Sequence, residues 1–277
     1  MEHREGTITG LRDIELYYQC WLPDGELRAV LLVVPGLAEH SGRYTNLVNY
    51  FVPRGYAVYG LDHCGHGKSQ GLRCHVERFS DYLDDLKTFF DLVRADHGAA
   101  DIFLVGHSMG GTIATAYAIR HQEELAGLIL SAATLKVGSG ITPLQILAAR
   151  VLSAVLPKMG VSVLDSSAIS QDQAVVDAYD NDPLVYRGKI RARLGAELLR
   201  TLQALPDQMP QINLPILIMQ GKADQLSDPE GSKMLYEKVA SKDKTLRLYE
   251  GQYHEIFNEP GRGQVFADME EWLDIRL

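Results

Sequence analysis

The chain has 277 residues, of which 46% are hydrophobic and 23% charged, a composition typical of a globular protein with one or two domains. Its formal net charge is −9 at pH 7, and no block of lysine or arginine interrupts it. These features argue against nucleic acid as a partner and against an anionic membrane surface held by charge. The three cysteines are too few for a disulfide framework, and the first residues carry no apolar signal region, so we expect a cytoplasmic protein.

Apolar runs alternate along the chain with segments of helical periodicity. Residues 29–34 are nearly all apolar and β-branched or leucine, which is typical of a strand buried on both faces. Strands that alternate with helices predict an α/β fold, with a mostly parallel central sheet and helices on both faces. The expected strands are residues 14–22, 29–34, 56–61, 102–105, 125–130, 215–220 and 245–249, and the expected helices are residues 44–52, 79–97, 109–121, 229–239 and 263–275.

Residues 131–214 interrupt this alternation because they contain no convincing strand. We expect a helical cap insertion at approximately residues 135–210, within a single domain of residues 1–277. Residues 141–156 of this insertion are mostly apolar, but they are shorter than the roughly 20 residues that a membrane span needs. Two alternatives stay open for them: a cap helix that packs on the core, or a helix whose exposed apolar face lines a lipid entrance or touches a bilayer.

The strongest motif is Gly-His-Ser-Met-Gly at residues 106–110, between an expected strand and an expected helix. In that context Gly-x-Ser-x-Gly predicts a nucleophile elbow, which holds Ser108 in a strained backbone conformation with its hydroxyl above the sheet edge. Gly106 and Gly110 are expected because a side chain there would collide with neighbouring backbone. The N–H of Met109, at the start of the helix, should point at the reacting centre, where the helix dipole favours negative charge.

A serine hydroxyl needs a base, and the base needs a group that orients it; in this fold they follow in the order serine, acid, histidine. Two histidines follow Ser108. His121 ends a helix, where a surface cation is common, whereas His254 follows the last expected strand and is predicted to be the base. Asp224 lies three residues past a strand and is predicted to be the acid, because Asp228 directly precedes a proline and fits a helix N-cap better.

Acyl transfer also creates an oxyanion, usually held by one N–H after the nucleophile and one from the loop after an earlier strand. Residues 33–44, with the sequence VVPGLAEHSGRY, supply such a loop directly after a buried strand. Gly36 allows close approach, so the N–H of Leu37 is predicted to be the second donor beside that of Met109.

These motifs resemble the monoacylglycerol lipase / lysophospholipase branch of the α/β-hydrolases. The resemblance covers nearly the whole chain in the right order and is weakest at residues 135–171. It implies an α/β-hydrolase fold, a Ser108–His254–Asp224 triad and hydrolysis of lipid esters, with monoacylglycerol cleaved to fatty acid and glycerol and no cofactor. The matching segments are residues 36–44 (GLAEHSGRY), 62–69 (DHCGHGKS), 106–111 (GHSMGG), 181–184 (NDPL), 221–224 (GKAD) and 249–254 (YEGQYH).

One departure from the family is Pro35, which stands where a histidine usually precedes the glycine. The oxyanion donor follows the glycine, so the hole should be retained. Pro35 has neither an N–H nor an imidazole, so we expect altered rigidity of the loop. By resemblance, Glu39 and Arg43 brace this loop and help form the polar end of the pocket; the alternative is a plain surface ion pair.

The sequence also leaves room for other functions. Thiols and imidazoles suit Zn²⁺, but the family's Asp-x-x-Gly-x-Gly-x-Ser turn accounts for the same segment, and triad chemistry needs no metal. Lysophospholipase or general carboxylesterase activity stays an alternative, whereas a non-catalytic binding protein would usually lack a triad member. We expect a lipid ester as the substrate, transient contact of the cap with a membrane or micelle, and no nucleic acid; the oligomeric state is not indicated. The possible zinc ligands are His63, Cys64, His66, Cys74 and His75.

Overall fold

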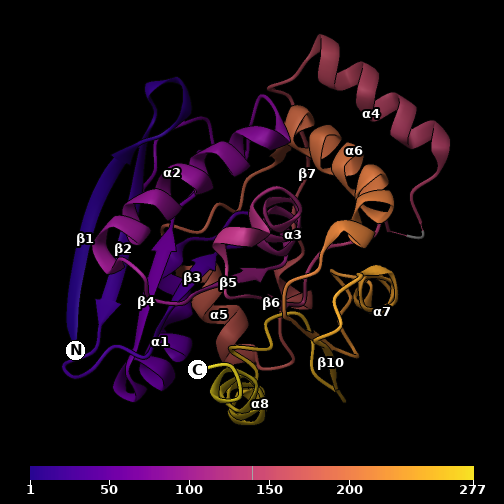
Figure 1. Cartoon of the computed structure of the whole chain (residues 1–277). Coiled ribbons are helices and arrows are strands. Elements are labelled where there is room, and N and C mark those ends of the chain that lie inside the picture. Colours follow the sequence, from indigo (N-terminus) through magenta and orange to yellow (C-terminus); the bar gives the residue numbers. More distant parts are fainter. Residues whose placement is uncertain (139) are drawn as a thin grey trace.

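The computed structural model describes residues 1–138 and 140–277, and its centre is one eight-stranded sheet (Figure 1). The first two strands of the sheet pair antiparallel, the second and third also pair antiparallel, and all other neighbours are parallel. The predicted mostly parallel sheet is therefore confirmed. In spatial order the strands are β1 (Glu2–Thr9), β2 (Glu15–Leu22), β4 (Tyr56–Leu61), β3 (Ala29–Val34), β5 (Ile102–His107), β6 (Gly127–Ser131), β9 (Ile216–Gly221) and β10 (Lys244–Tyr249).

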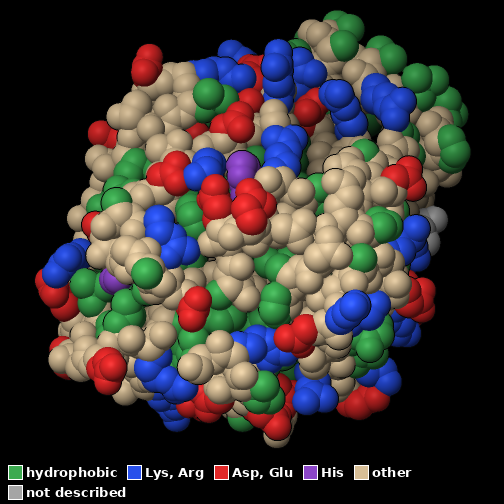
Figure 2. Space-filling model, viewed as in Figure 1, with side chains coloured by type: hydrophobic (Ala, Val, Ile, Leu, Met, Phe, Trp, Pro, Cys, Tyr) green, Lys and Arg blue, Asp and Glu red, His purple; other side chains and the backbone are tan. Residues whose placement is uncertain are grey.

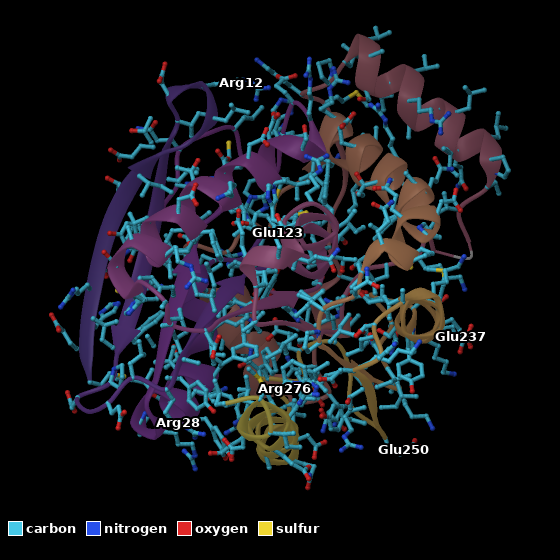
Figure 3. All side chains as sticks on the ribbon, viewed as in Figure 1. Arg12, Arg28, Glu123, Glu237, Glu250 and Arg276 are labelled. Carbon is cyan, nitrogen blue, oxygen red and sulfur yellow. The ribbon has the colours of Figure 1, made fainter. Side chains whose placement is uncertain are left out.

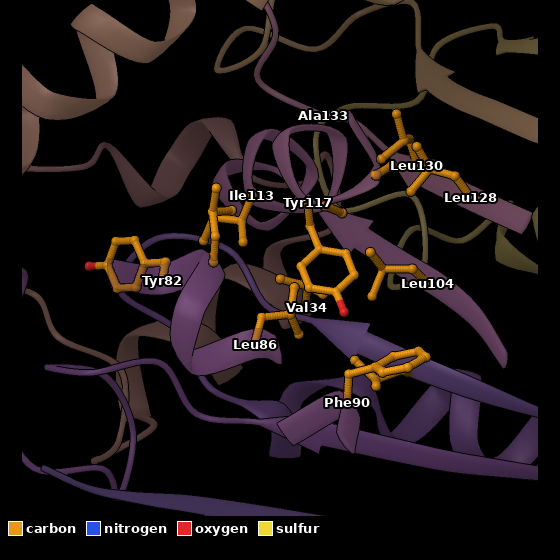
Figure 4. Packing of buried hydrophobic residues seen from close by; sticks show 14 of the residues in the cluster. Val34, Tyr82, Leu86, Phe90, Leu104, Ile113, Tyr117, Leu128, Leu130 and Ala133 are labelled. Atoms are coloured by element: carbon orange, nitrogen blue, oxygen red, sulfur yellow. The ribbon is translucent and has the colours of Figure 1, made fainter. Parts of the chain in front are cut away.

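Helices cover both faces of the sheet, as predicted. On one face lie α2 (Phe79–His97), α3 (Met109–His121) and α7 (Pro229–Lys238); on the other lie α1 (Thr45–Phe51) and α8 (Arg262–Asp274). Alternate side chains of β3 pack on opposite faces of the sheet, because successive residues of a strand point in opposite directions. Val34 packs with α2 and α3, whereas Val33 packs with α1 and α8. Figure 4 shows the first of these two cores, where Leu86 and Ile113 meet side chains of the central strands.

Strand β1 was not predicted from the sequence. Its residues are EHREGTIT, and most of them are exposed at the edge of the sheet. A charged edge strand resists pairing with other molecules, but it lacks the apolar alternation by which strands are recognised.

In the described part of the insertion between β6 and β9 there are three α-helices and two short strands, besides two single-turn 3₁₀ helices. The helices are α4 (Pro143–Val155), α5 (Gln173–Asn181) and α6 (Ala192–Gln208). The expectation of no strand here was wrong, because β7 (Gly160–Ser162) and β8 (Ile190–Arg191) pair antiparallel. Segments of two or three residues are too short to show a strand's alternation in the sequence. None of the helices among the described residues is long and apolar enough to cross a membrane.

Helix α4 packs on α6 and turns an apolar face to solvent. The one fully buried residue of α4 is Ser153, while four apolar side chains recur every three or four residues on the outer face. Figure 2 shows hydrophobic side chains gathered over this helix, at the upper right. Of the two alternatives for residues 141–156, the structure agrees with the one in which the helix keeps an apolar face exposed. The exposed fractions are 75% for Leu144, 56% for Leu147, 57% for Val151 and 70% for Val155.

Candidate active site

Ser108 lies in the turn between β5 and α3, with φ 53° and ψ −122°. This positive φ is a strained conformation for a residue with a side chain, and it confirms the predicted elbow. A Cβ on Gly106 would meet the carbonyl oxygen of Gly110, and a Cβ on Gly110 would meet the carbonyl oxygens of Val34 and Pro35. The predicted need for both glycines is therefore confirmed. Because these two residues have no side chains, the start of α3 packs closely against the end of β3 and the loop that follows it.

The carboxyl ends of β9 and β10 bring Asp224 and His254 together. His254 Nδ1 lies 2.8 Å from Asp224 Oδ2, and the amide group of Gln220 donates to the same oxygen at 2.8 Å. Asp224 Oδ1 accepts the backbone N–H groups of Leu226 and Ser227 at 2.8 and 3.0 Å. One buried carboxylate thus has four donors. Gln220 was not predicted, because a glutamine at the end of an apolar strand carries no motif of its own.

These contacts set the protonation of the pair. Burial opposes the charge on Asp224, but the hydrogen bond from His254 and the N–H donors hold its pKa below the ordinary value. Burial also opposes the charge on His254, yet the hydrogen bond and the charge of Asp224 raise its pKa above 6.5. An ionised Asp224 can only accept, so Nδ1 of His254 carries a proton and Nε2 remains free to take one.

A second histidine, His107, lies beside His254, with ring centroids 4.8 Å apart. Burial and the neighbouring His254 lower the pKa of His107 to about 4. Its Nδ1 lies 3.0 Å from the carbonyl oxygen of Ser131, which can only accept, so that nitrogen donates. His107 therefore stays neutral beside the base.

Ser108 and His254 face a cavity of about 170 Å³. Ser108, His254, Leu37, Met109 and Glu39 all line it, so the structure brings five of the sequence-predicted site residues together. Asp224 lies behind His254, and Arg43 lies behind Glu39. Apolar side chains of the insertion and of the loop after β9 form much of the wall: Leu164, Ile169, Leu198 and Leu226.

Two side chains hold the loop after β3 by bonding to its backbone groups. Leu37 N–H and Met109 N–H have no hydrogen-bond partner within residues 1–138 and 140–277, and both residues line the cavity. Gly36 N–H donates to Glu39 Oε1 at 2.5 Å, and His63 Nε2 donates to the carbonyl oxygen of Pro35 at 3.2 Å. Pro35 thus lacks an imidazole of its own, but the imidazole of His63 holds its carbonyl.

Glu39 and Arg43 belong to a buried network and do not form the surface ion pair that the sequence left open. The Arg43 side chain is 8% exposed, and its Nε lies 3.2 Å from Glu39 Oε2. Its Nη2 lies 2.5 and 2.6 Å from the two oxygens of Glu255, and its guanidinium covers the ring of Tyr179. Sequence reasoning missed Glu255, since a glutamate next to a loop histidine shows no sign of a partner 212 residues away.

The two carboxylates of this network differ in pKa. Burial raises the pKa of Glu255, and the charge of Arg43 only partly offsets that effect. Burial also opposes the charge on Glu39, but the charge of Arg43 and the hydrogen bonds from the Tyr44 hydroxyl and Gly36 N–H hold its pKa below the ordinary value. Both carboxylates share the single cation Arg43, which ties the loop after β3 to the segment that carries His254.

The side chains considered as zinc ligands do not converge on one point, although Cys74 Sγ lies 3.9 Å from His66 Nε2. His63 bonds to Pro35, His66 Nδ1 lies 3.0 Å from the carbonyl oxygen of Cys64, and His75 Nε2 lies 3.1 Å from Glu77. Across the described residues, one group of three or more possible ligand side chains brings its ligand atoms within 4.8 Å of one another. That group is His121, Glu123 and Glu124 on the surface at the end of α3.

A mostly parallel sheet with a serine elbow, and with a histidine–carboxylate pair at the carboxyl ends of its strands, defines a serine hydrolase of the α/β-hydrolase class. Residues 25–261 match the family model described as serine aminopeptidase, S33. The chain therefore belongs to this family of α/β-hydrolases, and its relatives confirm the resemblance to the monoacylglycerol lipases.

Two curated relatives match over nearly the full length. Monoacylglycerol lipase of Mycolicibacterium smegmatis is 36% identical over 269 residues, which cover 97% of this chain and 96% of the relative. Monoglyceride lipase of Homo sapiens is 36% identical over 264 residues, which cover 94% and 87%. The crystal structure of Paleococcus ferrophilus monoacylglycerol lipase superimposes with a TM-score of 0.85 at 31% identity, covering 95% of this chain and 99% of that one.

Proposed function

We propose that this protein hydrolyses monoacylglycerol to fatty acid and glycerol through an acyl-enzyme on Ser108. One observation carries the proposal: the lining of the cavity at Ser108 combines apolar side chains with the carboxylates of Glu39 and Glu255. An acyl chain suits the apolar side chains, and a glycerol group suits the carboxylates. Two relatives at 36% identity carry the names monoacylglycerol lipase and monoglyceride lipase, which supports this substrate class.

In the first half of the reaction Ser108 Oγ attacks the ester carbonyl while His254 Nε2 takes its proton. His254 then returns the proton to the leaving glycerol oxygen. Asp224 keeps Nδ1 protonated, so that Nε2 is the basic nitrogen, and it stabilises the imidazolium that forms. The tetrahedral oxyanion accepts hydrogen bonds from Leu37 N–H and Met109 N–H. Each such donor is worth roughly 10²–10³ in rate.

In the second half His254 takes a proton from a water molecule as that water attacks the acyl-enzyme, and it returns the proton to Ser108 Oγ as the bond to the acyl group breaks and the fatty acid leaves. The same two amides hold the second oxyanion. Glu39 and Arg43 are positioning residues in this scheme. Glu39 accepts Gly36 N–H and so holds the Pro35–Gly36 peptide, which directly precedes the peptide that carries the Leu37 donor.

The insertion at approximately residues 135–210 would act as a cap over the acyl chain. It contributes Leu164, Ile169 and Leu198 to the cavity wall. On its outer side α4 turns an apolar face to solvent, and this face would rest transiently on a membrane or micelle from which the substrate is taken. The protein would then work as a peripheral enzyme at lipid surfaces.

The test is hydrolysis of a matched lipid panel by wild type and by Ser108→Ala. The panel contains monoacylglycerols of increasing chain length, a lysophosphatidylcholine, a diacylglycerol, a triacylglycerol and a short p-nitrophenyl ester. We expect monoacylglycerols to be cleaved fastest and Ser108→Ala to be inactive. Fastest cleavage of the lysophosphatidylcholine, or of the short ester alone, would replace the substrate by a lysophospholipid or a general ester. Activity in Ser108→Ala would overturn the mechanism.

A further inference from the structure

A second and larger cavity lies on the other side of α6 from the active site. It has a volume of about 770 Å³ and lies between α2, α3 and α6. We call it the arginine groove, because its lining includes Arg12, Arg78, Arg120, Arg193 and Arg200. Figure 3 labels Arg12 at the upper end of the molecule, and Figure 2 shows Lys and Arg side chains gathered there. Such a concentration of arginine is unexpected in a chain with a net charge of −9.

The carboxylates of the groove neutralise only part of this charge. Arg12 pairs with Asp81 at 2.5 Å, Arg193 lies 4.0 Å from Glu77, and Arg200 lies 3.5 Å from Glu197. The other two arginines, Arg78 and Arg120, form no ion pair with the described residues, and both are exposed. The groove therefore has positive charge in excess and attracts anions.

One donor in the groove lacks an acceptor. Nε of Arg193 is buried and has no hydrogen-bond partner among the described residues, since 4.0 Å to Glu77 exceeds hydrogen-bond length. A buried donor without an acceptor is unfavourable, so native structures usually satisfy such groups. The Arg193 side chain as a whole is 30% exposed, so the rest of its guanidinium, rather than Nε, is open to an acceptor oxygen in the groove.

The groove already holds an anionic group at the start of α2. The carboxylate of Glu197 accepts the N–H of Phe79, the first residue of that helix, at 3.1 Å. A negative charge at this position is stabilised by the helix dipole. The hydroxyl groups of Ser80 and Thr201 line the same space, and Phe79, Leu83 and Leu205 give it an apolar floor.

We infer that the arginine groove binds a phosphate ester, with the phosphate on Arg78 and Arg193 and the organic part on the apolar floor. Guanidinium groups match phosphate oxygens in geometry and form charge-assisted hydrogen bonds with them. The volume of about 770 Å³ falls in the range of roughly 300–1,000 Å³ that small-molecule sites occupy, well above what an inorganic ion fills.

This site is distinct from the active site. The two cavities share no lining residue, because α6 turns Leu198 toward the catalytic cavity and Glu197 and Thr201 toward the groove. Binding in the groove therefore needs neither Ser108 nor a lipid ester, and it is measured independently of hydrolysis. The inference does not rest on the proposed substrate.

The experiment is calorimetric titration of the full chain with inorganic phosphate and with glycerol 3-phosphate, using glycerol as the ligand without phosphate. We expect glycerol 3-phosphate to bind, and Arg78→Gln and Arg193→Gln each to weaken its Kd roughly tenfold, the equivalent of one hydrogen bond to a charged group. Glu77→Gln should tighten binding several-fold, because it removes a carboxylate that competes for Arg193. The control is Arg262→Gln, an exposed arginine at the start of α8, which should bind as wild type does.

A second arm identifies the source of the phosphate. Vesicles of phosphatidylcholine with and without phosphatidic acid are sedimented with wild type and with the Arg78→Gln/Arg193→Gln double variant. Retention that depends on phosphatidic acid and on the two arginines assigns the groove to a lipid headgroup; binding of soluble phosphate esters alone assigns it to a free metabolite. If the double variant matches wild type for both the soluble ligands and the vesicles, the groove is not a phosphate site.

Discussion

The active site and the outer face of α4 depart in opposite ways from the usual distribution of residues between core and surface. At the carboxyl ends of the strands the chain buries charged groups, including Asp224, Glu39 and His254. On α4 it exposes large apolar groups, including Leu144 and Val155. Charged residues are rarely buried unless paired, and contiguous apolar patches on a surface usually mark a contact.

The two regions differ in where their partners are. Every buried charge of the active site has a partner within the chain: Asp224 with His254, and Arg43 with both Glu39 and Glu255. The outer side chains of α4 are exposed, so the chain itself does not cover them. The active site is therefore explained by internal contacts, whereas the α4 face is explained by something outside the chain, which we propose is a lipid surface.

The largest effect that tests this comparison is expected from Asp224→Asn. The asparagine would no longer require a proton on Nδ1 of His254, so the basic nitrogen would be lost and kcat should fall by about 10⁴. The measurement is kcat for monoacylglycerol hydrolysis, with circular dichroism to show that the fold is retained. The control is Asp228→Asn, at the N-cap of α7, which should keep wild-type kcat. Equal activity of the two variants would contradict the role of Asp224.

A smaller effect, this time on stability, is expected from Arg43→Met. The substitution leaves Glu39 and Glu255 buried without their cation, so it should lower the free energy of unfolding by about 3–5 kcal/mol. Urea denaturation measures this loss. The control is Arg54→Met, which breaks an exposed ion pair to Glu270 and should cost no more than about 1 kcal/mol. If the two variants are equally stable, the buried network does not hold the loop.

The pH dependence of kcat/KM gives a third test. The base must be neutral to take a proton, and Asp224 raises the pKa of His254 above 6.5. Activity should therefore fall about tenfold per pH unit once the pH drops below that raised value. Residual activity of Asp224→Asn should show its acid limb at lower pH, because the carboxylate that raises the pKa is gone. If the acid limb does not move in Asp224→Asn, it reports the titration of a group other than His254. The control is the surface variant His121→Gln, whose acid limb should match that of wild type.

Placement of the site could be predicted because its signals are local. Gly106, Ser108 and Gly110 form a turn that needs no distant residue to be recognised, and parallel strands end at one edge of the sheet, so residues after β9 and β10 were expected to meet there. The two-sided burial of β3 also followed from its unbroken apolar run. Each of these predictions depends on the order of residues within one short segment.

What could not be predicted depends on contacts between distant segments. Glu255 is an ordinary loop charge in the sequence until Arg43 is placed beside it, and no local pattern indicates that His63 bonds to Pro35. The strands β7 and β8 depend on their pairing alone. The excess of positive charge in the arginine groove arises from four separate stretches of a chain that is acidic as a whole.

The smallest effect on stability, and the sharpest test of the α4 face, is expected from the double variant Leu144→Gln/Val151→Gln. Both side chains are more than half exposed, so each substitution should change the free energy of unfolding by no more than about 0.5 kcal/mol. If the face rests on lipid, the variant gives up the burial of two apolar side chains there, worth about 1.5–3 kcal/mol each when complete. Its retention on uncharged phosphatidylcholine vesicles should then fall at least tenfold.

The matched control for this variant is Ile275→Gln, because Ile275 and Leu144 are both 75% exposed. Leu144 belongs to α4, whereas Ile275 directly follows α8, and these two helices lie far apart in Figure 1. Loss of vesicle binding in both variants would mean that any exposed apolar residue serves, and loss in neither would mean that the α4 face has another partner. Loss in the α4 variant alone, with unchanged cleavage of the short soluble ester, would separate the two regions: the chemistry belongs to the buried charges, and access to lipid belongs to the exposed face.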